Sequence, residues 1–196
     1  MKKLLRTVVV TGIPGVGKST VLGELQNLAK EKEANLVTVN YGTVMNELFQ
    51  NLGKSIHRDE MRRQGLESQR KIQEQAAEII AGKARDGILV VDTHSFVRTS
   101  SGFWPGLPYN VLAKLKPSLF VLVEASTDEI AMRRQKDKTR MRDEGSLEEV
   151  KFDLTWSRAT VSSCAVLAAA PAIIIKNETG KQRQAAERLW NAISNL

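Results

Sequence analysis

The sequence is poor in the residues that build disulfides and zinc centres. It contains one cysteine, Cys164, and two histidines. One cysteine cannot form an intramolecular disulfide, and this small set gives no credible zinc cluster. Cys164 lies in the segment VSSCAVLAAA, which is more typical of inert helical packing than of a reactive thiol. A disulfide scaffold and a zinc protein are therefore excluded, and we predict a cytoplasmic location.

Long apolar runs are also missing. No stretch approaches the roughly 20 apolar residues that a membrane-spanning helix requires. The N-terminal MKKLLRTVVV briefly resembles a signal peptide, but Arg6 interrupts its apolar run, so we assign it as the lead-in to a first strand. An apolar content of 42% and a charged content of 26% are ordinary for one soluble α/β domain with a small insertion. No membrane contact is predicted.

Acidic residues are outnumbered by basic ones, 22 to 29, giving a formal net charge of +7. Such an excess suits either nucleic acid or a small polyanionic substrate. The densest positive run extends from Arg133 to Arg142, which contains six basic residues and one acidic residue, Asp137. No aromatic side chains are interleaved there to stack on bases. The distribution favours a small polyanion and disfavours nucleic acid.

A phosphate-binding loop is the strongest motif present. Gly12, four intervening residues and then Gly17-Lys18-Ser19 fit the pattern G-x-x-x-x-G-K-[ST], between a β-branched run and an amphipathic helix. The glycines allow several N–H groups to point at one anion, and the helix N-terminus adds positive charge. Lys18 can bridge the β- and γ-phosphates of a nucleotide, and the Ser19 hydroxyl can ligate Mg²⁺. In the absence of nucleotide we expect Lys18 to be solvated.

Apolar strands and helix-like segments alternate along the chain. The predicted strands are 7–11, 36–39, 88–92, 119–123 and 172–175. The predicted helices are 18–32, 43–52, 59–85, 109–115, 127–136, 146–170 and 181–195, with Gly65 as a break in the third. Alternation of this kind predicts a parallel sheet with helices on both faces. Region 40–85 is too long for one crossover helix, so we predict a helical insertion there.

A second set of polar residues follows the third predicted strand. Asp92 ends that strand, where a P-loop protein holds Mg²⁺ directly or through water. Arg98 comes six residues later and leads into a Pro/Gly-rich loop, TSSGFWPGLP, expected at the same sheet edge. His94 lies between them and is predicted to be a hydrogen-bonded structural residue.

Five motifs in order carry a family resemblance: VTGIPGVGKST, NYG, RDEMR, VDTH…VRT and PGLP. Over nearly the whole chain, the sequence resembles the archaeal-type adenylate kinases. The resemblance implies the reaction ATP + AMP ⇌ 2 ADP with Mg²⁺. It implies one P-loop kinase domain spanning 1–196, an α/β fold with a five-stranded parallel sheet flanked by helices. It also implies that the insertion at about 40–85 binds AMP, that a short lid lies at about 135–146, and that the protein is a homotrimer.

The resemblance also assigns roles to individual residues. The ATP phosphates would be bound by Gly12, Ile13, Pro14, Gly15, Val16, Gly17, Lys18, Ser19 and Thr20, with Arg134 flanking the adenine. AMP would contact Tyr41, Gly42, Arg62 and, through its phosphate, Arg98. Lys18, Arg98, Arg140 and Arg142 would act on the transferring phosphoryl group, and Asp92 would hold Mg²⁺ through water. Arg62 replaces the arginine that the bacterial enzymes carry after their T-G-D motif.

Two other functions are compatible with these motifs. Base choice depends on pocket shape, so the acceptor could be CMP, UMP or dTMP rather than AMP. A less favoured alternative, suggested by the net charge, is an ATP-dependent nucleic-acid-binding protein.

Overall fold

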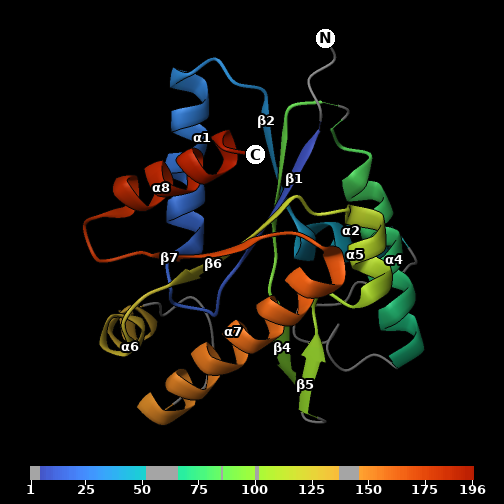
Figure 1. Ribbon diagram of the computed structural model, residues 1–196. Helices are drawn as coiled ribbons and strands as arrows, with labels where there is room; N and C mark the ends of the chain where they lie inside the picture. Colours follow the sequence, from blue (N-terminus) through green and yellow to red (C-terminus); the bar gives the residue numbers. More distant parts are fainter. Residues whose placement is uncertain (1–4, 52–65, 85, 100–101, 137–145) are drawn as a thin grey trace.

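The computed structural model describes residues 5–51, 66–84, 86–99, 102–136 and 146–196 (Figure 1). Five strands form one parallel sheet in the order β2-β3-β1-β6-β7. These strands are β1 (Arg6–Thr11), β2 (Leu36–Asn40), β3 (Ile88–Asp92), β6 (Leu119–Glu124) and β7 (Ala172–Lys176). All five lie where the sequence predicted them, and the predicted fold class is confirmed.

Helices cover both faces of this sheet. They are α1 (Lys18–Glu31), α2 (Tyr41–Asn51), α4 (Leu66–Ala81), α5 (Tyr109–Leu115), α6 (Thr127–Lys136), α7 (Leu147–Ala168) and α8 (Gln182–Ser194). In Figure 1, α1 and α8 lie together on one side, and α2, α4 and α5 lie on the other. No helix among the residues described is both long enough and apolar enough to span a bilayer. The helix predicted over 59–85 ends early, at Ala81, because the chain turns at Gly82 and Lys83.

Alternate residues of the central strands supply two separate cores. Val8 and Val10 of β1 pack with α1 and α8, whereas Val9 between them packs with α2, α4 and α5. This is the period of two expected of a strand that is buried on both faces. Cys164 of α7 belongs to the second core, where burial raises its pKa to about 11, so its predicted role in packing is confirmed.

A short antiparallel hairpin stands outside the main sheet. Its strands are β4 (Phe96–Thr99) and β5 (Gly102–Pro105). β5 lies within the segment TSSGFWPGLP that the sequence suggested to be a loop, and β4 ends where that segment begins. Gly106 joins the hairpin to the chain before it, since its N–H donates to Ser95 O at 2.9 Å. A Cβ atom on Gly106 would lie 1.9 Å from His94 O, so only glycine fits this close approach.

Candidate active site

The phosphate-binding loop connects the carboxyl end of β1 to α1. Gly15 and Gly17 adopt φ angles of 95° and 79°, in the left-handed region that glycine favours. Gly17 is the N-cap residue of α1, and within the described residues no side chain caps that helix. The first N–H groups of α1 have no intrahelical acceptors and are directed toward the loop, which makes a site for an anion.

Lys18 is not solvated, which corrects our expectation. Its ammonium donates to Asp92 Oδ1 and, at 2.6 Å, to Thr93 O. The Lys18 and Asp92 side chains are only 10% and 12% exposed. Burial lowers the pKa of Lys18, and the Asp92 carboxylate opposes that shift. Lys18 is therefore held in an internal ion pair with Asp92.

Sheet register explains the surroundings of Asp92. Asp92 lies opposite Val10 of β1 on one side and opposite Asn40 of β2 on the other. Asn40 Nδ2 donates to the second carboxylate oxygen, Oδ2, at 2.7 Å. Because β1, β2 and β3 run in parallel, their carboxyl ends gather these groups beside the phosphate-binding loop.

The oxygen atoms at this edge of the sheet are of the kind that a hard cation such as Mg²⁺ prefers as ligands. Asp92 offers carboxylate oxygens, and Ser19 offers an exposed hydroxyl at the start of α1. Within the part of the chain that the structure describes, no group of three or more acidic, histidine or cysteine side chains could hold a metal by itself. Mg²⁺ commonly takes one or two protein ligands together with substrate phosphates and water, so this donor set is sufficient.

Arg98 projects from β4 toward α7 rather than standing alone. Its Nε and Nη2 donate to one oxygen of Asp153, Oδ1, at 2.9 and 2.7 Å. The guanidinium carbon lies 5.0 Å from the ring centroid of Phe103 and 5.9 Å from that of Phe152. The Arg98 side chain is 47% exposed, whereas that of Asp153 is 9% exposed. The guanidinium of Arg98 thus hydrogen-bonds Asp153 and contacts aromatic rings, while part of the side chain stays accessible to solvent.

The residues expected around AMP differ in their accessibility. Tyr41 at the start of α2 is buried, and its hydroxyl donates to Gln73 O of α4. Burial raises the pKa of the Tyr41 hydroxyl above its ordinary value. Gly42 beside it is partly exposed. The other predicted arginines, Arg62, Arg140 and Arg142, lie outside the described residues.

Two more predicted residues contact the phosphate-binding loop from outside. Arg134 of α6 donates through Nε to Pro14 O at 3.0 Å, and burial lowers its pKa. His94 Nδ1 lies 2.9 Å from Gly12 O, where the ring donates to the carbonyl, in agreement with a structural role.

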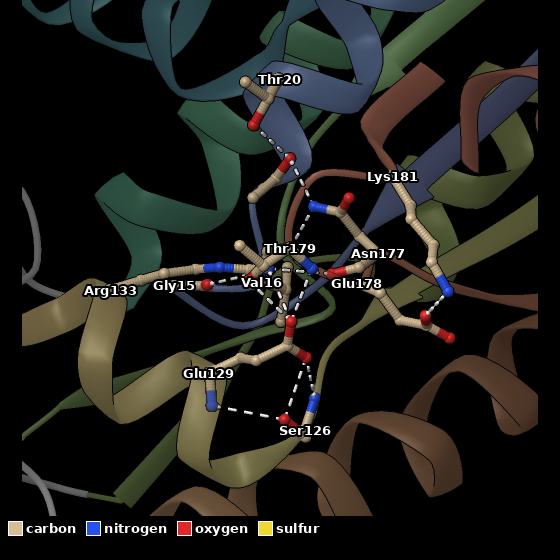
Figure 2. A network of polar contacts seen from close by, with 11 residues as sticks. Gly15, Val16, Thr20, Ser126, Glu129, Arg133, Asn177, Glu178, Thr179 and Lys181 are labelled. Atoms are coloured by element: carbon tan, nitrogen blue, oxygen red, sulfur yellow. Dashed lines mark hydrogen bonds and ion pairs between the residues drawn. The ribbon is translucent and has the colours of Figure 1, made fainter. Parts of the chain in front are cut away.

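Sequence reasoning missed two residues that also contact the loop. Arg133 of α6 and Asn177, the residue after β7, both donate to Val16 O, at 3.1 and 2.8 Å (Figure 2). The signal available in the sequence was positional, because Asn177 is a polar residue at the carboxyl end of a predicted strand. Their acceptors are main-chain carbonyls, which no motif reports.

Taken together, the strand order, the loop after β1 and the Lys18–Asp92 pair define a P-loop kinase fold. In agreement, residues 11–151 match the AAA domain family. Two solved shikimate kinases share this architecture at low sequence identity. The enzyme from Acinetobacter baumannii, in complex with shikimate, superimposes with a TM-score of 0.56 at 15% identity, over 97% of this chain and 94% of the other. The enzyme from Bacteroides thetaiotaomicron gives a TM-score of 0.58 at 12% identity, over 96% and 98%.

Sequence relatives define the family more narrowly. The chain is 43% identical to an adenylate kinase of Methanocaldococcus jannaschii, over 88% of this chain and 90% of the other. It is 41% identical to an adenylate kinase of Methanothermobacter thermautotrophicus, over 96% of this chain and 100% of the other. The chain therefore belongs to the adenylate kinase family, and the resemblance based on its motifs is confirmed.

Proposed function

We propose that the protein catalyses the reversible transfer of a phosphoryl group from ATP to AMP, giving two molecules of ADP. The observation that carries this proposal is the 43% identity to an adenylate kinase over 88% of the chain. The phosphate-binding loop, with Lys18 buried against Asp92, supplies a site with the chemistry that the reaction requires.

ATP would bind with its phosphates along Gly12–Thr20. The N–H groups of the loop and of the first turn of α1 would bind the phosphate oxygens, and Lys18 would leave Asp92 to contact the β- and γ-phosphates. Ser19 would hold Mg²⁺ directly and Asp92 would hold it through water, and the ion when bound neutralises phosphate charge. Arg134 would flank the adenine in the ATP complex.

AMP would bind across the site from ATP, with its phosphate on Arg98. Arginine suits this role because its planar fork matches a phosphate dianion. The proposed pocket includes Tyr41 and Gly42 of α2, and Arg62. As Tyr41 is buried, we assign its contribution to shaping the pocket wall through Gln73 rather than to a polar contact with the nucleotide.

Phosphoryl transfer needs positioning and charge stabilisation more than covalent chemistry. The phosphate oxygen of AMP is already ionised at neutral pH, so no general base is required. Lys18, Arg98, Arg140 and Arg142 would neutralise the charge that spreads over the transferring group. Each well-placed donor of this kind contributes about 3–4 kcal/mol to the transition state.

We also propose roles for two regions of the domain, 40–85 and 135–146. Region 40–85 would form the AMP-binding insertion, of which the structure describes α2 and α4, packed against each other. Region 135–146 would form a lid that excludes water during transfer. The cytoplasmic location remains a prediction.

Turnover of each nucleoside monophosphate tests the function directly. Purified protein is mixed with Mg-ATP and with AMP, CMP, UMP or dTMP in turn, and the products are separated by chromatography. We expect ADP from AMP to form fastest. Rapid turnover of CMP, UMP or dTMP with none of AMP would reassign the protein to another nucleoside monophosphate kinase. Salt-dependent retention of RNA or DNA on filters, without transfer to any monophosphate, would support the nucleic-acid alternative instead.

We also propose that copies of this chain associate, as the predicted homotrimer requires. Support comes from an apolar groove of about 400 Å³ between α7 and β7, the edge strand of the sheet. Val166, Leu167 and Ile174 beside it are 78%, 58% and 52% exposed. Light scattering coupled to gel filtration gives the mass, and Ile174→Glu should convert the oligomer to monomers. A wild-type monomer at micromolar concentration would refute the proposal.

A further inference from the structure

Four successive carbonyl groups of the phosphate-binding loop accept hydrogen bonds from side chains, most of them from α6 and from Asn177 after β7. Pro14 O accepts from Arg134 at 3.0 Å, and Gly15 O accepts from Arg133 Nη1 at 3.5 Å. Val16 O accepts from the same Arg133 atom at 3.1 Å and from Asn177 Nδ2 at 2.8 Å. Gly17 O accepts from Asn177 Nδ2 at 3.4 Å and also from the Thr20 hydroxyl at 2.9 Å.

The direction of these carbonyls determines the direction of the loop N–H groups. In a planar trans peptide, the C=O of one residue and the N–H of the next point in opposite directions. When Val16 O points away from the concave side of the loop, the N–H of Gly17 therefore points into it. In the same way, the direction of Gly17 O makes the backbone N–H of Lys18 point into the concave side. The side chains that donate to these carbonyls consequently determine how the loop N–H groups are directed toward a bound anion.

Arg133 is itself fixed from two sides (Figure 2). Its Nη2 lies 3.3 Å from Glu129 Oε1 and donates to Asn177 O and the Thr179 hydroxyl, both at 3.0 Å. Glu129 in turn accepts from the Thr179 hydroxyl at 2.7 Å and from the Ser126 hydroxyl at 2.9 Å. These bonds, those from Thr179 above all, lower the pKa of Glu129 to about 2, so its carboxylate stays charged.

Asn177 supplies an independent contact from a different element. It is 1% exposed, and its N–H donates to Glu124 O at 2.7 Å, which fixes the residue at the end of β7. A Cβ atom on Gly17 would lie 2.4 Å from Asn177 Nδ2, so the amide reaches the loop only because residue 17 is glycine. The loop is thus held from α6 and from the β7–α8 connection at once.

We infer that Arg133 and Asn177 are positioning residues for nucleotide binding, which hold the phosphate-binding loop in its anion-accepting shape. Neither residue needs to contact ATP for this role. The inference deepens the proposed function and rests on it for the identity of the ligand. It adds that affinity for the triphosphate depends on α6 and on the β7–α8 connection, not on the loop motif alone.

Titration with Mg-ATP in a calorimeter, without AMP, tests the inference independently of turnover. Arg133→Met removes the guanidinium and keeps the aliphatic stem, and Asn177→Ala removes the amide. Arg133→Met should weaken Mg-ATP binding by about 10- to 100-fold, the range for losing hydrogen bonds from a charged group. Asn177→Ala should weaken it less, by about 2- to 10-fold, because the lost bonds join neutral groups. Arg133→Lys keeps the charge but has no planar fork, so its affinity should be intermediate.

Arg183→Met is the matched control. Arg183 also forms a two-point ion pair, with Glu31 at 2.9 and 2.5 Å, but it lies on the surface of α8. This variant should bind Mg-ATP as the wild type does. Thermal unfolding is recorded for every variant, so that loss of folded protein is not counted as loss of affinity.

The outcomes separate this inference from the proposed function. Weaker Mg-ATP binding in folded Arg133→Met, with the KM for AMP within about twofold of wild type, supports positioning. If Arg133→Met does not fold, Asn177→Ala decides by the same measurement. Unchanged Mg-ATP affinity in the folded variants would overturn the inference and leave the two residues as ordinary packing groups. A wild-type protein that binds Mg-ATP but does not phosphorylate AMP would refute the proposed function alone.

Discussion

Replacing Lys18 with methionine should destabilise the nucleotide-free protein as well as inactivate it. The substitution keeps the aliphatic stem but removes the ammonium that pairs with Asp92 and donates to Thr93 O. Among the described residues, the Asp92 carboxylate, 12% exposed, would then keep its hydrogen bond from Asn40 at 2.7 Å as its one remaining side-chain partner. Removing one partner of a buried ion pair costs about 3–5 kcal/mol. The variant keeps the bond from Asn40 and no longer bears the desolvation cost of the Lys18 ammonium. We therefore expect the free energy of unfolding to fall by about 2–3 kcal/mol.

A loss of this size is measurable by thermal and urea unfolding without nucleotide. For a chain of this length we expect Tm to fall by about 5–10 °C. Adding Asp92→Asn to Lys18→Met should restore part of the loss, because it removes the uncompensated charge. Lys114→Met serves as a control, since Lys114 pairs with Glu78 at the surface, where such pairs contribute less than about 1 kcal/mol. The kcat of Lys18→Met should fall several hundredfold or more.

The reasoning would be refuted by an unchanged free energy of unfolding in Lys18→Met. That result would mean that the ammonium is solvated in the free protein and that the ion pair contributes nothing. A wild-type kcat in Lys18→Met would separately show that the loop binds phosphate without taking part in transfer.

Three further predictions concern other parts of the molecule. Arg98→Lys keeps the charge but loses the planar fork, so kcat/KM for AMP should fall by about 30- to 160-fold, the equivalent of about 2–3 kcal/mol. The KM for ATP should change little, and equal losses for both substrates would contradict the assignment. Glu129 has a folded-state pKa of about 2 against an ordinary value of 4.5, so its stabilising effect should be present above about pH 5 and be lost as pH falls toward 2. Urea unfolding across this range should show a flatter pH dependence for Glu129→Gln, and an unchanged profile would contradict the pKa. Gly106→Ala should cost about 3 kcal/mol or prevent folding, because its Cβ would lie 1.9 Å from His94 O, whereas Gly23→Ala in α1, with open space, should be neutral or stabilising in thermal unfolding.

The main sheet was predictable because its strands are short apolar runs separated by amphipathic helices. The β4–β5 hairpin was not, because its strands have four residues each and lie among the glycines and prolines that usually indicate a loop. The hairpin is stabilised instead by distant contacts, among them the stacking of Phe103 on Trp156 of α7 with ring centroids 5.1 Å apart.

The candidate site was predictable where side chains follow a motif. The loop and Asp92 follow the P-loop pattern, and both are located at the expected sheet edge. The pairing of Lys18 with Asp92 was not predictable, because the motif describes the contacts that the loop makes with a nucleotide. The contacts of Arg133 and Asn177 depend on where α6 and β7 come to lie, and their acceptors are peptide carbonyls common to every sequence.

The separation of Asn177 from Val16, 161 positions along the chain, bears on when the site forms during synthesis. The whole phosphate-binding motif leaves the ribosome long before the β7–α8 connection exists. Contacts between such distant segments form late, since the intervening chain must fold first. A nascent chain that ends before α6 therefore carries the motif without the groups that shape it. Full nucleotide affinity would therefore be reached only once β7 has joined the sheet.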